Sequence, residues 1–117
     1  MTHKDLEVWK RSMKLVKDVY QLSALLSEDE KYGLISQLNR AAVSIPANIA
    51  EGAGRSSSKE YIRFLDIATG SVSELETLLI LSEQLLGVKS DQLINSDIKS
   101  IRVMLTGLKR SLKGKIK

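Results

Sequence analysis

What this 117-residue chain lacks excludes several kinds of chemistry. It has no cysteine, so disulfides and thiolate metal sites are excluded, and the lack suits a reducing, cytoplasmic setting. The one histidine, His3, has no clustered donors beside it, so neither a metal site nor a Ser-His-Asp set is predicted. We therefore expect no catalytic residue, no metal and no cofactor. One enzyme hypothesis is left, carboxylates at the 51–60 corner, and no motif supports it.

Long apolar runs and sheet-forming patterns are also missing. The longest apolar run, residues 78–81, is far shorter than a membrane span, and the charged start of the chain shows no signal peptide. We therefore expect no membrane partner. The chain has a single proline, and only 4% of its residues are aromatic. This scarcity, with few β-branched runs, argues against a sheet.

The periodicity that is present is helical, because apolar residues recur at steps of three and four. We predict helices over about residues 5–25, 30–52, 57–87 and 91–113, the third with Ser57 and Glu60 as a capping box and Gly87 as its end. Short breaks between helices make sequential helices antiparallel neighbours. The sequence therefore predicts an all-α protein, an antiparallel up-down-up-down four-helix bundle, as a single domain over residues 1–117.

The first predicted helix has two apolar stripes, on roughly opposite faces. We expect the first stripe to face the bundle core and the second to need a partner outside it. The first comprises Leu6, Trp9, Met13, Val16 and Tyr20, and the second comprises Val8, Leu15, Val19, Leu22 and Leu26.

The second predicted helix holds the only proline, within the stretch SIPANIAEGAGR. Pro46 removes one backbone N–H and disfavours helical geometry at Ile45. Ile45 and Ile49 nevertheless continue the apolar stripe set by Leu38 without a slip. We therefore predict a single kinked second helix.

Polar residues of the second helix fall within one arc of roughly 80° beside its apolar stripe. They mix amide, hydroxyl, guanidinium and carboxylate groups, which can form a connected hydrogen-bond network. Two interpretations stay open: polar contacts between helices of one bundle, or a buried polar seam between subunits. The arc comprises Gln37, Arg40, Ser44, Asn48, Glu51 and Arg55.

Charge is uneven along the chain. From residue 99 onward there are seven basic residues and no acidic one, whereas the whole chain has a net charge of +4. This pattern is typical either of a solvated helix end or of a surface that attracts phosphates or acidic proteins. Five of these residues form a basic ridge opposite the apolar stripe of the fourth helix, which we predict as a nucleic-acid surface: Lys99, Arg102, Lys109, Arg110 and Lys113.

Three blocks, DLEVWKRS, YGLISQLNRAAVSIPANIAEGAGR and EYIRFLDIATGSVSELET, resemble a bacterial four-helix bundle family. That family was first noticed in proteins encoded by intervening sequences within large-subunit ribosomal RNA genes. The resemblance implies a homo-oligomeric ring, a pentamer in known cases. A relative in diversity-generating retroelements binds a reverse transcriptase and nucleic acid through a basic surface. Carried over to this chain, the assembly or partner-site candidates are Gln37, Arg40, Ser44, Asn48, Glu51, Gly52, Arg55, Glu60 and Glu74.

Two functional hypotheses follow. The first is a non-enzymatic oligomeric bundle that acts as an adaptor for RNA, DNA or a nucleic-acid enzyme, motivated by the basic ridge and the resemblance. The second is a structural or protein-partner module without nucleic-acid binding, whose basic end meets an acidic protein.

Overall fold

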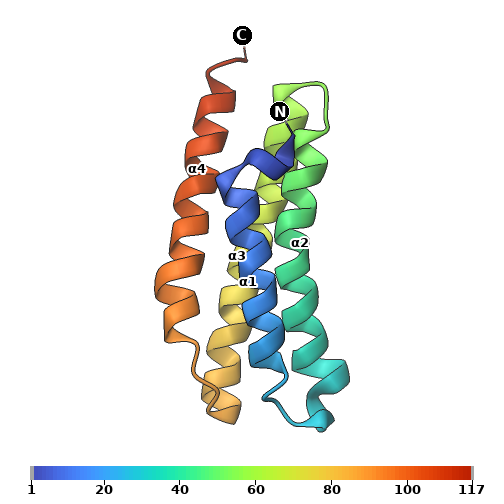
Figure 1. The fold of residues 1–117 in the computed structure, drawn as a ribbon, viewed down its shortest axis with the longest axis vertical. Coiled ribbons are helices and arrows are strands. Elements are labelled where there is room, and N and C mark those ends of the chain that lie inside the picture. The colour runs from blue at the N-terminus through green and yellow to red at the C-terminus, as the bar shows by residue number, and fades with distance from the viewer. Residues whose placement is uncertain (1, 117) are drawn as a thin grey trace.

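The structure is a computed structural model that describes residues 2–116, apart from the side chain of residue 31. Its regular elements over this range are all helices. The long ones are α1 (Glu7–Ser23), α2 (Ser36–Ala53), α3 (Ser58–Leu86) and α4 (Lys99–Lys113). Short 3-10 turns, η1 (His3–Asp5) and η2 (Glu28–Glu30), and π-helical segments, η3 (Lys31–Ile35) and η4 (Leu93–Ile98), complete the chain. Successive helices run in opposite directions (Figure 1), so the predicted up-down-up-down bundle is confirmed.

Both ends of α3 follow from local sequence. The Ser57 side chain accepts a bond from the backbone N–H of Glu60 at 3.1 Å, as an N-cap does. The Glu60 carboxylate binds Arg63 instead of closing the predicted capping box. Gly87 ends the helix with φ at +73°, the left-handed geometry that glycine adopts without a Cβ clash.

The second helix is continuous through Pro46, as predicted. Pro46 is buried within α2, where it can offer no N–H to the carbonyl one turn earlier. A kink that was not predicted lies earlier in the predicted 30–52 helix, at Gly33 inside η3, where φ is −105° and ψ is −109°. The fourth helix also begins irregularly, because η4 occupies part of the predicted 91–113 span.

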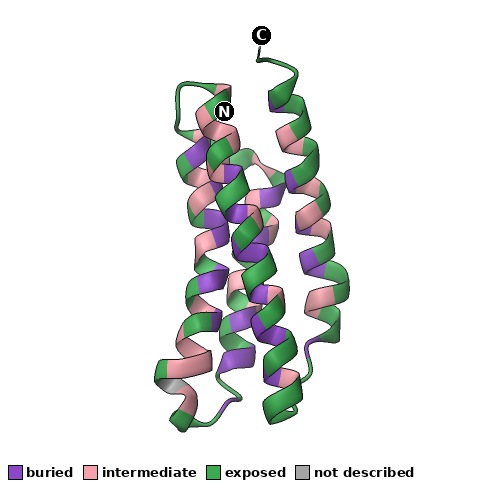
Figure 2. Cartoon of the chain, turned by 180° about the vertical axis from the view of Figure 1, so that it is seen from behind, coloured by how far each residue is buried: buried purple, intermediate pink, exposed green. Residues whose placement is uncertain are grey.

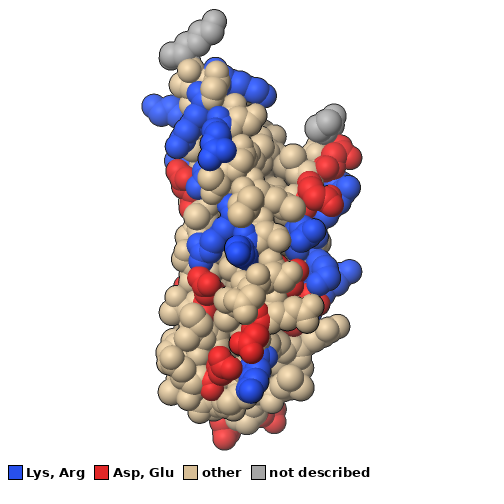
Figure 3. Space-filling view, turned by 90° about the vertical axis from the view of Figure 1, so that its left-hand side faces the viewer, with Lys and Arg blue, Asp and Glu red and all other residues tan. Residues whose placement is uncertain are grey.

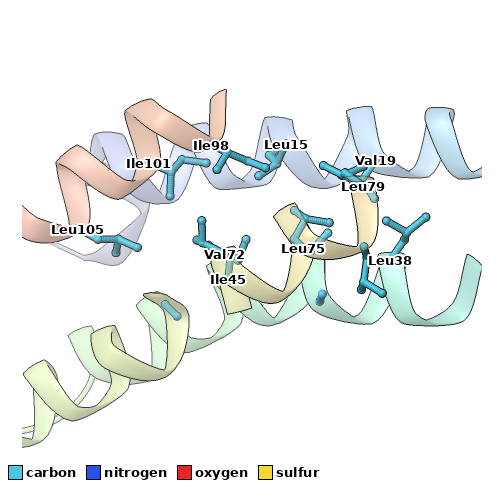
Figure 4. Packing of buried hydrophobic residues seen from close by; sticks show 14 of the residues in the cluster. Leu15, Val19, Leu38, Ile45, Val72, Leu75, Leu79, Ile98, Ile101 and Leu105 are labelled. Atoms are coloured by element: carbon cyan, nitrogen blue, oxygen red, sulfur yellow. The ribbon is translucent and has the colours of Figure 1, made fainter. Parts of the chain in front are cut away.

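One apolar core cluster lies inside the bundle, which measures 50 × 24 × 20 Å, and Figure 4 shows part of this core from close by. Each of α1 to α4 contributes, and buried residues lie on the sides of the helices that face one another (Figure 2). Full burial of one such side chain stabilises the folded state by about 1.5–3 kcal/mol. Residues without exposed surface include Leu15, Val19, Leu38, Ile45, Leu65, Leu75, Leu79, Ile101 and Leu105.

The prediction for the faces of the first helix was wrong. The second stripe, from Val8 to Leu26, is the one in the core, whereas Met13 is 40% exposed and Tyr20 is 49% exposed. The two stripes are similar in apolar content, so helical periodicity alone could not choose between them. The indole N–H of Trp9 and the hydroxyl of Tyr20 favour positions that are partly exposed to solvent, and the structure places both side chains in such positions.

The ends of α2 and α3 that the 54–57 turn joins approach each other closely at Gly52. A Cβ on Gly52 would lie 3.0 Å from the Phe64 Cβ, 3.0 Å from the Tyr61 Cδ1 and 3.1 Å from the Tyr61 carbonyl oxygen. Real Cβ atoms rarely have neighbours this near, and one of them is backbone. A residue larger than glycine therefore forces the two helices apart.

We expect Gly52→Ala to destabilise the fold by about 1–2 kcal/mol, because an overpacking cost exceeds the gain in helix propensity. Gly70→Ala is the matched control: Gly70 lies within α3, and a Cβ added there would have no atom within 4 Å. It should stabilise the fold by about 0.5–1 kcal/mol. Urea unfolding of both variants measures the difference, and equal effects at the two sites would contradict the close approach.

Candidate interaction surfaces

The predicted polar arc lies along the groove between α2 and α3. At its centre the Ser44 and Ser71 hydroxyls bond each other at 2.8 Å. The Asn48 amide donates to the Ser44 carbonyl oxygen at 2.8 Å and to its hydroxyl at 3.0 Å. The Ser44–Ser71 bond joins α2 to α3 within one bundle, as in the first of the two interpretations, whereas both Asn48 bonds lie within α2. The Ser44–Ser71 bond sets the register of α2 against α3.

Toward the kinked end, the same groove opens into a hollow of about 460 Å³. It is lined by Gln37, Arg40, Ala41, Ser44 and Glu74. Arg40 and Glu74 are both exposed, and neither takes part in an ion pair among the side chains that the structure describes. The hollow therefore offers one guanidinium and one carboxylate to an outside group.

The other end of the groove, near the 54–57 turn, carries a stacked cluster. The guanidinium carbons of Arg55 and Arg63 lie 4.7 and 4.4 Å from the centre of the Phe64 ring. Arg55 also pairs with Glu51 at 2.9 Å, and Arg63 pairs with Glu60 at 3.0 Å. The roles of Arg63 and Phe64 were not predicted from the sequence, although the i,i+3 and i,i+4 charge spacings could have indicated both ion pairs.

The Glu60–Arg63 pair changes the titration of both groups. The hydrogen bond from Arg63 lowers the pKa of Glu60 below its ordinary value, and the same bond raises the pKa of Arg63. Because the folded-state pKa of Glu60 is depressed, the pair stabilises the fold above the unfolded-state pKa. That contribution is lost as pH falls through the folded-state pKa.

Two residues of the predicted basic ridge hold α4 against α3. The Arg102 guanidinium binds the Glu76 carboxylate at 2.5 Å and the Ser73 hydroxyl at 3.1 Å. The Lys109 ammonium binds the Asp66 carboxylate at 3.2 Å and the Thr69 hydroxyl at 3.1 Å. Their charges are therefore largely compensated within the bundle.

The other three ridge residues, Lys99, Arg110 and Lys113, are exposed. None of them joins an ion pair within the part of the chain that the structure describes. Figure 3 views the molecule from the side on which α4 lies, and it shows Lys and Arg side chains gathered toward the C-terminal end. The structure thus divides the ridge into a pair that anchors α4 and an outer set open to solvent.

Apolar side chains are exposed along the groove between α1 and α2. Met13 and Tyr20 come from α1, and Val43, 42% exposed, comes from α2. A hollow of about 340 Å³ beside Tyr20 is lined by Asn39, Arg40, Val43 and Ser44. Arg40 and Ser44 also line the hollow between α2 and α3, so the two grooves share one wall.

The described residues form no cluster that could hold a metal ion and no helix that could span a membrane. Within residues 2–116, no three His, Cys, Asp or Glu side chains come together in a way that could hold a metal ion. The ring of His3 meets Trp9 edge to face at 5.2 Å between centroids. None of the helices formed by these residues has the length and apolar character of a membrane span.

Comparisons with known proteins agree with the fold. The family model described as 23S rRNA-intervening sequence protein matches residues 4–107. No curated protein matches the chain. One similar solved structure is a protein of unknown function from the S23 ribosomal protein family of Bacteroides thetaiotaomicron, 25% identical with a TM-score of 0.64. The match covers 94% of this chain and 98% of that one.

The anchoring role of Arg102 predicts a measurable coupling with Glu76. In a double-mutant cycle of Arg102→Gln and Glu76→Gln, we expect a coupling of about 0.5–1 kcal/mol, as for part-exposed ion pairs. Replacing Arg102→Gln by Arg110→Gln in the same cycle should give no coupling, because Arg110 faces solvent. A coupling equal in both cycles would refute the anchor. Chemical denaturation measures all the variants.

The titration of Glu60 predicts a second result. Arg63→Gln should raise the pKa of Glu60 toward its ordinary value, since the largest cause of the lowering is the hydrogen bond from Arg63. Arg55→Gln should move it less, because Arg55 acts only through its charge. Side-chain NMR titration of the three proteins checks this order, and a larger shift in Arg55→Gln would reverse our assignment.

Proposed function

The chain belongs to the 23S rRNA-intervening sequence protein family, and we propose that it is a non-enzymatic, self-assembling scaffold that binds nucleic acid through the outer face of α4. The family is one of unknown function. The proposal therefore rests on the surfaces of this chain, with the family resemblance as an analogy.

The outer set of α4, defined as Lys99, Arg110 and Lys113, is the observation that carries the proposal. These cations lie on a helix that has no acidic residue between positions 99 and 113. Because they are spread along one side of the helix, they can contact separate phosphates of a nucleic-acid backbone. Aromatic side chains are absent from α4, so the expected contact is electrostatic and poorly specific for sequence.

Self-assembly is the second part of the proposal. The α1–α2 groove exposes Met13, Tyr20 and Val43, and the neighbouring hollow exposes Arg40 and Glu74 without ion-pair partners in the described residues. A second copy of the chain that covers this region would bury the apolar groups and pair the charges. The ring of five that the resemblance implies is the form we expect.

Nucleic-acid binding can be tested by neutralising the outer set. In the variant Lys99→Gln/Arg110→Gln/Lys113→Gln, we expect weaker binding of a fluorescein-labelled DNA duplex. The slope of log affinity against log salt should also fall by about 0.9 for each phosphate that the variant no longer neutralises. Fluorescence anisotropy over a series of KCl concentrations measures both quantities.

The matched control is Lys10→Gln/Lys17→Gln/Lys59→Gln, which removes the same charge from exposed sites on α1 and α3. It should leave the slope nearly unchanged. Equal weakening in the two variants would mean that only net charge matters and would contradict a binding face on α4. No binding by the unmodified chain would favour the protein-partner alternative.

A further inference from the structure

A cavity of about 550 Å³ lies where the C-terminal half of α1 meets the segment that leads from α3 into α4. It is separate from the outer set of α4 and from the grooves that flank α2. Leu22, Leu25 and Leu93 form its apolar wall. The rest of the lining is polar and charged, which is the mixture typical of small-molecule sites.

Asp97 is the first sign that this cavity is built for a ligand. It is the one ionisable residue buried among the described side chains, and it is 9% exposed. Its single partner is the Lys14 ammonium, 3.8 Å from Oδ1, which is too far for a hydrogen bond. Lys14 lies much closer to Asp18, at 2.7 Å. The Asp97 side chain keeps 12% of its surface exposed, and it lines the cavity with no hydrogen-bond donor among the described residues, so its carboxylate is free to accept from a ligand there.

Ser90 is an independent second sign. It lines the same cavity, it is 6% exposed, and its hydroxyl has no hydrogen-bond partner in the described part of the chain. Its carbonyl oxygen accepts from the Ile94 N–H at 3.0 Å, so Ser90 stands at the start of the last helical run. Serine in that position ordinarily caps the helix with its side chain, and here the hydroxyl is left unused.

The backbone around these two residues is unusual as well. Asp97 belongs to the π-helical η4. Such wide turns are rare and occur frequently at functional sites.

Charge indicates the class of ligand. Three carboxylates, on Asp18, Asp91 and Asp97, face two ammonium groups, on Lys14 and Lys89, so the lining carries one excess negative charge. The carboxylates do not form a group that could hold a metal ion among the described residues. An organic cation fits better, because its N–H groups can donate to Asp97 while its carbon chain packs against the leucines.

We propose that this cavity binds a primary alkylammonium group, with Asp97 as its main acceptor and Ser90 as an additional polar contact. The group can belong to a small free amine or to the lysine side chain of a partner, since both present the same chemistry. Lys14 is 62% exposed at its side chain and stays paired with Asp18 when the ligand enters.

The test is an NMR titration of the isotope-labelled full chain with pentylammonium chloride. We expect shifts of backbone amides in segments 18–25 and 89–98. Pentanol supplies the carbon chain without the charge, and ammonium chloride supplies the charge without the chain, so both should bind much more weakly. Tighter binding of cadaverine would indicate a free amine, and tighter binding of N-acetyl-lysine methylamide would indicate a partner lysine.

Two variants locate the site. Asp97→Asn should weaken pentylammonium binding by about tenfold or more, whereas Glu7→Gln, at an exposed carboxylate at the opposite end of α1, should not change it. Leu25→Lys is a second probe that spares the core, because Leu25 is 74% exposed at the cavity rim, and it should also weaken binding. Unchanged binding in a folded Asp97→Asn or Leu25→Lys variant, or equal binding of pentanol, would overturn the proposal.

Discussion

The close packing of α2 on α3 is the constraint on which the rest of this structure depends. Gly52 admits Tyr61 and Phe64 at one end of the groove, and the Ser44–Ser71 bond holds the two helices farther along. Both contacts belong to the same antiparallel register. With that register fixed, α1 and α4 complete the core from the other side, and the α2–α3 groove itself faces outward as a continuous surface. The stretch around Pro46 is therefore the part of α2 that carries this packing, and its small and polar residues are what close contact between helices requires.

The charges of α4 serve two separate purposes in this account. Arg102 and Lys109 bind acidic and hydroxyl groups of α3, and so they position the helix. The outer set points away from the bundle and leaves its charge for a partner. A helix rich in lysine and arginine can in this way stabilise the bundle and still present the cations that the proposed binding face requires. It also means that net charge alone overstates the number of cations available to a phosphate backbone.

Much of the fold could be predicted from the sequence, because helix ends and periodicity are local properties. The Ser57 cap, the Gly87 end and the continuous helix through Pro46 were all indicated by neighbouring residues. The face that α1 buries was not, because its two apolar stripes are nearly equivalent until the other helices are placed around them. The partners of Arg102 and Lys109 lie on α3, 26 and 43 positions away, so only the tertiary arrangement reveals them. The same holds for the cavity at Asp97, whose walls come from segments distant in sequence.

Self-assembly is the central claim about function, and one measurement tests it most directly. Size-exclusion chromatography with light scattering, at low and at high salt, gives the mass of the purified chain in solution. The account predicts a single species of several subunits, with five expected, that persists at high salt because buried apolar contacts resist screening. A monomer at both salt concentrations would contradict it, and the exposed side chains of the α1–α2 groove would then belong to contacts with a different protein.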